Sequence, residues 1–78
     1  MPGFFLFSPE RMKAIRERRG MSREQLAVDA DLSYAMIAAL EGGLRNPSRE
    51  TLICLAAALD VLPRELVDED PVFEPVAP

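Results

Sequence analysis

Apolar residues recur along most of this chain at the three- and four-residue spacing of amphipathic helices, and no segment shows the sustained alternation of a half-buried strand. The clearest stripe falls in the segment 49–59 and consists of Leu52, Leu55, Ala56 and Leu59. Ile37 and Leu40 form a shorter stripe upstream. The pattern predicts helices over residues 9–19, 23–30, 34–41 and 49–59, and a short helix near residues 63–68.

Serine residues mark where the first four helices begin. The stretches FSPERM, MSREQL, LSYAMI and PSRETL each place a serine before a helical segment. A serine at this position accepts a hydrogen bond from a free N–H group of the first helical turn. Gly20 and the pair Gly42 and Gly43 follow helices that they can end, and Pro63 can open the short last helix.

The connection between the second and third helices is unusually short. Only Asp31 and Leu32 separate Ala30 from Ser33. Helices joined so tightly cross at a steep angle, as they do in a helix-turn-helix unit. The 78 residues, of which 49% are hydrophobic, suit one small domain with a modest core. We predict an all-α domain over residues 9–68, preceded by an apolar arm (1–8) and followed by an acidic, proline-rich tail (69–78).

The residues around this turn resemble the Cro/repressor-type (XRE-like) helix-turn-helix family of bacterial and phage transcription regulators. The resemblance extends from about Phe7 to Val67 and depends on the stretches IRERRGMSREQLA, LSYAMIAALEGG, RNPSRETLICLAAAL and VLPRELV. It implies a five-helix bundle of the phage-repressor-like DNA-binding type. It also implies that helix 34–41 lies in the major groove of double-stranded DNA, usually as part of a homodimer on a near-palindromic operator.

The resemblance also implies roles for individual residues. An ion pair is expected between Arg16 and Glu41. The family positions for DNA phosphate contacts are Ser22, Arg45 and Asn46, and those for base contacts are Arg23, Ser33, Tyr34, Ala35, Ala38 and Ala39. One departure is Asp31, where the family generally has glycine. Aspartate tolerates the left-handed backbone of such a turn better than most residues do.

The predicted reading face has few hydrogen-bonding side chains. On a helical wheel with Ile37 at zero, Ala35, Ala38, Ala39 and Gly42 fall at about 100–200°. Alanine can touch a thymine methyl group, but such sparse contacts would leave more of the specificity to DNA shape. Alternatively, the helix-turn-helix is a protein–protein interaction module, of an antitoxin or a regulator partner, with weak or no DNA binding. Small residues suit close helix packing, and Val28 adds an apolar side chain nearby.

The charges are unevenly distributed along the chain. The net charge is −4, but residues 1–23 carry six cationic side chains and two acidic ones, whereas residues 51–78 carry one cationic and six acidic. A cationic front with an acidic rear predicts that one face only docks on phosphate groups.

Surplus apolar residues predict a partner chain. Phe4, Phe5, Cys54 and Leu62 exceed what one small bundle buries comfortably, so we expect them at a homodimer interface. For Cys54, the role of a small half-buried hydrophobe is favoured over a redox or metal role.

Enzymatic chemistry finds little support in the composition. With no histidine and one cysteine, the chain lacks the usual zinc ligand sets and histidine-based acid–base chemistry. Its carboxylates show no recognisable catalytic spacing, so we expect no enzymatic activity, metal, cofactor or small-molecule ligand. No apolar run approaches a membrane span, and a single cysteine suits the cytoplasm. The sequence predicts a small cytoplasmic regulator, such as a restriction–modification controller, a phage repressor or an antitoxin.

Overall fold

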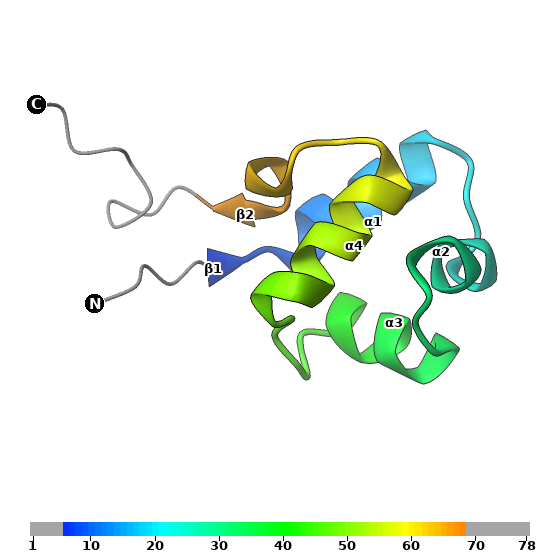
Figure 1. The fold of residues 1–78 in the computed structure, drawn as a ribbon, viewed down its shortest axis with the longest axis horizontal. Coiled ribbons are helices and arrows are strands. Elements are labelled where there is room, and N and C mark those ends of the chain that lie inside the picture. The colour runs from blue at the N-terminus through cyan, green and yellow to red at the C-terminus, as the bar shows by residue number, and fades with distance from the viewer. Residues whose placement is uncertain (1–5, 69–78) are drawn as a thin grey trace, which may run out of the picture.

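The computed structural model describes residues 6–68, which form a helical domain with a small two-stranded sheet. The predicted interface residues Phe4 and Phe5 and the predicted tail (69–78) lie outside the described residues. The elements in order are β1 (Leu6–Phe7), α1 (Pro9–Arg18), α2 (Arg23–Ala30), α3 (Tyr34–Glu41), α4 (Arg49–Leu59), the 3₁₀ helix η1 (Pro63–Leu66) and β2 (Val67–Asp68). Figure 1 shows α2 at the end of the domain away from the strands and α3 along its lower side.

The four α-helices begin where the serine residues predicted. The hydroxyl oxygens of Ser8, Ser22, Ser33 and Ser48 accept from the backbone N–H groups of Arg11, Gln25, Met36 and Thr51 over 3.0–3.2 Å. Each bond satisfies one of the N–H groups that have no partner within their own helix. The predicted helices are thereby confirmed, except that α1 ends one residue earlier, at Arg18.

The tight turn between α2 and α3 forms around Asp31 in spite of the missing glycine. Asp31 adopts the left-handed conformation with φ 59°, and Asp60 does the same after α4 with φ 58°. The N–H of Leu32 donates to the carbonyl of Ala27 over 2.9 Å, which closes the end of α2. The short connection therefore sets the position of α3 relative to α2.

The prediction of a helix near residues 63–68 is wrong in part. Residues 63–66 form a single 3₁₀ turn, and residues 67–68 form a strand antiparallel to β1, in which Phe7 pairs with Val67. The N–H of Ser8 also donates to the carbonyl of Leu66 over 2.9 Å. A four-residue segment offers little room for α-helical bonds, and the β-branched Val67 favours the ladder. Residues 6–8, predicted as part of an arm, thus pack within the fold.

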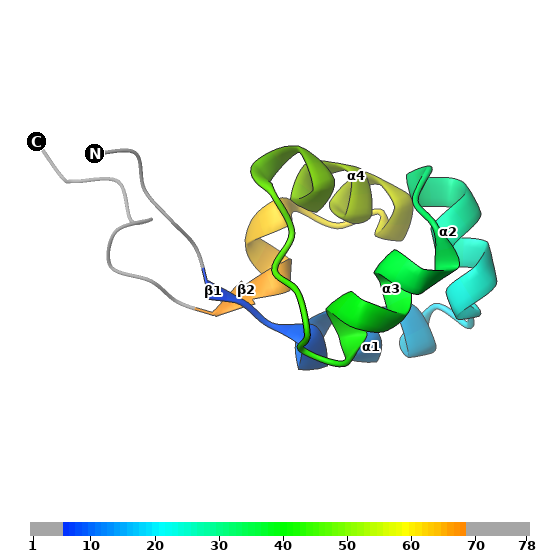
Figure 2. The same cartoon turned by 90° about the horizontal axis from the view of Figure 1, so that it is seen from below.

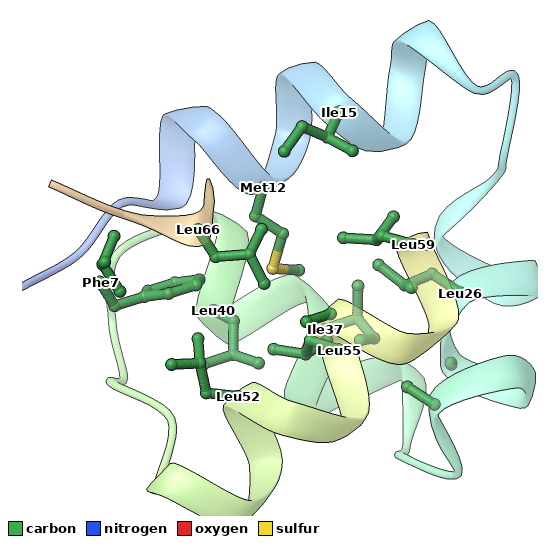
Figure 3. Packing of buried hydrophobic residues seen from close by; sticks show 14 residues of the cluster. Phe7, Met12, Ile15, Leu26, Ile37, Leu40, Leu52, Leu55, Leu59 and Leu66 are labelled. Carbon is green, nitrogen blue, oxygen red and sulfur yellow. The ribbon is translucent and has the colours of Figure 1, made fainter. Parts of the chain in front are cut away.

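The core lies where the four α-helices and η1 meet (Figure 3). Its fully buried side chains are Met12, Leu26, Ile37, Leu40, Leu55, Leu59 and Leu66. The predicted stripe of α4 is buried throughout. Burying each large side chain contributes about 1.5–3 kcal/mol, so Ile37 and Leu40 hold the inner face of α3 firmly to the domain. Figure 2 shows the opposite face of α3 directed out of the domain.

Candidate nucleic-acid interface

Glu41, the last residue of α3, forms a buried ion pair with Arg16 of α1. Arg16 Nε and Nη2 donate to the two carboxylate oxygens of Glu41 over 2.5 and 3.1 Å. Arg16 Nη1 donates to the carbonyl of Met21 over 2.7 Å, between α1 and α2. The side chains are 9% and 1% exposed, respectively. This pair therefore fixes the end of α3 to α1, and the additional bond from Arg16 to Met21 fixes the loop between α1 and α2 to the same side chain.

Arg23, the first residue of α2, shares the same carboxylate. Its Nε donates to Glu41 Oε1 over 3.1 Å, and 38% of its side chain is exposed. The Tyr34 hydroxyl and the Glu41 carboxylate raise the pKa of Arg23 above its ordinary value. Sequence reasoning placed Arg23 among the base contacts and missed this pairing, because nothing in the residue pattern joins the start of α2 to the end of α3.

The environment of Glu41 keeps it ionised. Burial by itself raises the pKa of this carboxyl, but hydrogen bonds from Arg16 and Arg23 outweigh it and hold the pKa below the ordinary 4.5. One carboxylate faces two guanidinium groups, so the cluster carries one net positive charge. That charge lies on the exposed side, at Arg23.

The outer face of α3 is less open than the helical wheel predicted. Ala35 is exposed, but Ala38 and Ala39 are only half-exposed. Tyr34 is 46% exposed and has the largest side chain among the predicted base-contact positions of this helix. The exposed Ser33 precedes it, with its hydroxyl accepting from the Met36 amide and still able to donate. The face offers polar groups mainly at the amino end of α3.

The predicted phosphate contacts lie near the two ends of the helix-turn-helix. Ser22 is exposed at the start of α2, and Arg45 and Asn46 are exposed in the loop after α3. Gly43 precedes them with φ +76°, a conformation that favours glycine. The structure brings these residues to the surface, and their contacts with DNA remain predictions.

The basic residues of the first part of the chain and the acidic residues of the last part do not lie on two separate faces of the structure. Arg11 Nε lies 3.1 Å from Asp68 Oδ1, and Arg19 Nη2 lies 3.8 Å from Asp60 Oδ2. Folding thus places acidic residues of the second half against the basic helix α1. The predicted separation of a cationic front from an acidic rear does not hold at these two arginines, because each has an acidic neighbour from the second half of the chain.

Exposed apolar side chains are found on several elements. Cys54 and Leu62, predicted at a dimer interface, are both exposed, Leu62 by 53%, so the expectation of a half-buried Cys54 is wrong for the single chain. Ile53 is 51% exposed beside Cys54 on α4 and was missed, although its position next to the buried Leu52 was a usable signal. Val28 and Leu44 are more exposed still, by 75% and 81%.

Comparison with known proteins gives the same architecture. A family model described as Helix-turn-helix matches residues 12–66, which is most of the chain. The chain belongs to the Cro/repressor-type helix-turn-helix family. It is 37% identical to the immunity repressor protein of Bacillus phage phi105 over 65 residues, which cover 83% of this chain and 45% of the repressor. The chain thus spans less than half of that relative.

Two solved structures of this family are similar along much of the chain. The restriction–modification controller protein C.AhdI from Aeromonas hydrophila has a TM-score of 0.73 and 38% identity, covering 74% of this chain and 88% of its own. SinR, a master regulator for biofilm formation solved in complex with DNA, has a TM-score of 0.72 and 32% identity, covering 76% and 98%.

Two features are absent from residues 6–68. Over this range no helix is long and apolar enough to cross a membrane. The same range contains no group of three or more cysteine, aspartate or glutamate side chains placed to hold a metal ion.

Proposed function

We propose that this protein is a sequence-specific DNA-binding transcription regulator that binds a near-palindromic operator as a homodimer. The observation that carries the proposal is the placement of α3: its inner face is buried through Ile37 and Leu40, its end is fixed at Glu41, and its other face is directed outward. An α-helix held in this way can enter a major groove. The likeness to SinR in complex with DNA supports the same use of this fold.

In this proposal the two classes of contact come from different places. Ser22, Arg45 and Asn46 bind phosphate groups and set the register on the duplex without reading sequence. Ser33 and Tyr34 donate to base edges, and the alanines of α3 contact thymine methyl groups. Because so few side chains reach the bases, sequence-dependent DNA shape supplies the remaining specificity.

The second copy is proposed to pack on the exposed apolar residues of α4 and the loop after it, namely Ile53, Cys54 and Leu62. The two copies of α3 then enter successive major grooves about 34–36 Å apart on one side of the duplex. We expect Leu62→Glu to give monomers and to weaken operator binding. Sedimentation that shows an unaltered state in the variant, or a monomeric wild type at high concentration, contradicts the dimer.

Selection from random double-stranded DNA tests the whole proposal. We expect an enriched pseudo-palindrome with half-site centres about 10–10.5 base pairs apart, or a multiple of that spacing. A substitution at an exposed residue of α1 outside the proposed interface, Glu17→Gln, serves as a control that should enrich the same sequence.

A second candidate, a helix-turn-helix that binds another protein, is favoured by the 75% exposure of Val28 on α2. An exposed apolar side chain there fits a protein surface better than it fits a polyanion. Selection distinguishes the two: no enrichment at low salt would overturn DNA reading and leave this candidate.

A further inference from the structure

Arg23 differs from the other arginines of the described surface in what holds it. Its Nε donates to Glu41, whose carboxylate is 1% exposed and is already held by Arg16. Arg11 and Arg19, by contrast, pair with carboxylates that are mostly exposed. An arginine bound to a buried, fixed carboxylate loses much of the freedom that a surface side chain normally has.

The position of Arg23 relative to α3 follows from its partner. Tyr34 and Glu41 lie seven residues apart, which places both on nearly the same side of the helix, and Ala38 lies between them on that side. Tyr34 and Glu41 both raise the pKa of Arg23. The bond from Arg23 Nε to Glu41 therefore places the guanidinium beside this side of α3.

The guanidinium keeps hydrogen-bonding capacity after pairing with Glu41. It carries five N–H donors, and its bond to Glu41 uses one of them. Its side chain remains 38% exposed, at the first residue of α2, next to the N–H groups of that helix's first turn. The cluster also has one positive charge in excess. A fixed, partly exposed fork of donors suits a phosphate group, whose oxygens accept two N–H bonds at once.

We propose that Glu41 is a positioning residue for DNA binding, because it holds Arg23 beside α3 so that the remaining donors of Arg23 bind a DNA phosphate. This inference rests on the proposed function. It moves Arg23 from the base contacts to the phosphate contacts, and it gives Glu41 a role beyond its structural bond to Arg16.

The first test uses the two properties of Arg23, its charge and its fork. Affinity is measured for a random-sequence duplex and for the duplex enriched by selection, over a range of salt concentrations. We expect Arg23→Gln to weaken both duplexes about equally and to flatten the slope of log affinity against log salt by about two for a dimer. Arg23→Lys keeps the charge and most of the slope, but loses about tenfold in affinity because an ammonium does not form the fork.

Arg18→Gln is the matched control, since it removes the same charge from an exposed site on α1 beside η1. It should leave the slope nearly unchanged. An Arg23→Lys protein that binds like the wild type overturns the inference. So does an Arg23→Gln protein that loses affinity only for the enriched duplex, because Arg23 would then read a base.

The second test uses the sign of the Glu41 charge. Removing a carboxylate near DNA should strengthen binding, and Asp31→Asn at the α2–α3 turn is expected to do so. For Glu41→Gln we expect the opposite, a loss of about tenfold per folded molecule, because Arg23 is no longer held. Circular dichroism gives the folded fraction of each variant. If Glu41→Gln does not fold, Arg23→Lys still tests the proposal, because it leaves the bond between Glu41 and Arg16 in place.

A gain in affinity for folded Glu41→Gln, parallel to that of Asp31→Asn, overturns the positioning role. If the wild type binds neither duplex, the proposed function fails together with the inference. If the wild type binds and the Arg23 and Glu41 variants behave like their controls, only the inference fails.

Discussion

Two ion pairs anchor α1 to other parts of the fold, and they differ mainly in their access to water. Arg16 bonds Glu41 where both side chains are at least nine-tenths buried, whereas Arg11 bonds Asp68 where both side chains are more than half exposed. In water the attraction is screened and ordering two long side chains costs entropy, so the exposed pair contributes little. The buried pair has no water to replace a lost partner. A pair of a guanidinium and a carboxylate therefore contributes more to the free energy of unfolding where it is buried than where it is exposed.

Removing Arg16 should give the largest effect. Arg16→Ala leaves the buried Glu41 carboxylate with Arg23 as its only remaining ionic partner within residues 6–68, and it also removes the bond to the Met21 carbonyl. We expect the free energy of unfolding to fall by about 3 kcal/mol, at the low end for a broken buried pair because Arg23 still compensates in part. Chemical denaturation measures the change. A double-mutant cycle with Glu41→Gln that shows strict additivity would contradict the coupling.

The second-largest effect is expected from acid, which should weaken the buried pair. The pKa of Glu41 is lower in the folded protein than its ordinary 4.5, so folding favours the ionised form. The stabilisation is fully present above the ordinary pKa and is lost as the pH falls through the lower folded pKa. We expect the stability difference between the wild type and Glu41→Gln to shrink as the pH falls below about 4.5. A difference that stays constant from pH 7 to about pH 2 would show that the carboxylate charge is not involved.

The exposed pair should give the smallest effect. Arg11→Ala is expected to lower the free energy of unfolding by about 0.5 kcal/mol or less, and the change should diminish at high salt. Arg19→Ala, whose partner Asp60 lies at 3.8 Å, serves as a comparison and should change stability even less. A loss above about 2 kcal/mol for Arg11→Ala would remove the contrast between the two ends of α1.

Local chemistry made most of the fold predictable from the sequence. The four serine caps and the helical spacing of Leu52, Leu55 and Leu59 act within one or two turns, so they predict the helices without knowledge of the tertiary structure. The β1–β2 ladder escaped prediction because two residues are too few to show an alternating pattern. Its formation depends on contacts between residues some 60 positions apart in the sequence, which a local pattern does not contain.

The candidate site was predictable only in part. The resemblance placed Arg16 opposite Glu41, and the structure shows them bonded. The third member, Arg23, depends on how steeply α2 and α3 cross, and that angle is not encoded in the spacing of either helix. The paired charges of Arg11 and Arg19 were missed for the same reason, because a charge count along the chain does not say which residues meet. The assigned DNA contacts stay predictions.

The β1–β2 ladder, which joins Leu6 to Asp68, affects the order in which parts of the domain fold and open. It closes a loop of roughly 60 residues, and the entropy lost in closing a loop grows with the length of the loop. A hydrogen bond within an α-helix, by contrast, joins residues only four positions apart. Few hydrogen bonds hold the ladder, so this end of the domain should form late in folding and open early. The amide of Ser8, bonded to Leu66 across this closure, would then exchange its hydrogen with solvent faster than the amides of α4, whose bonds stay within one helix.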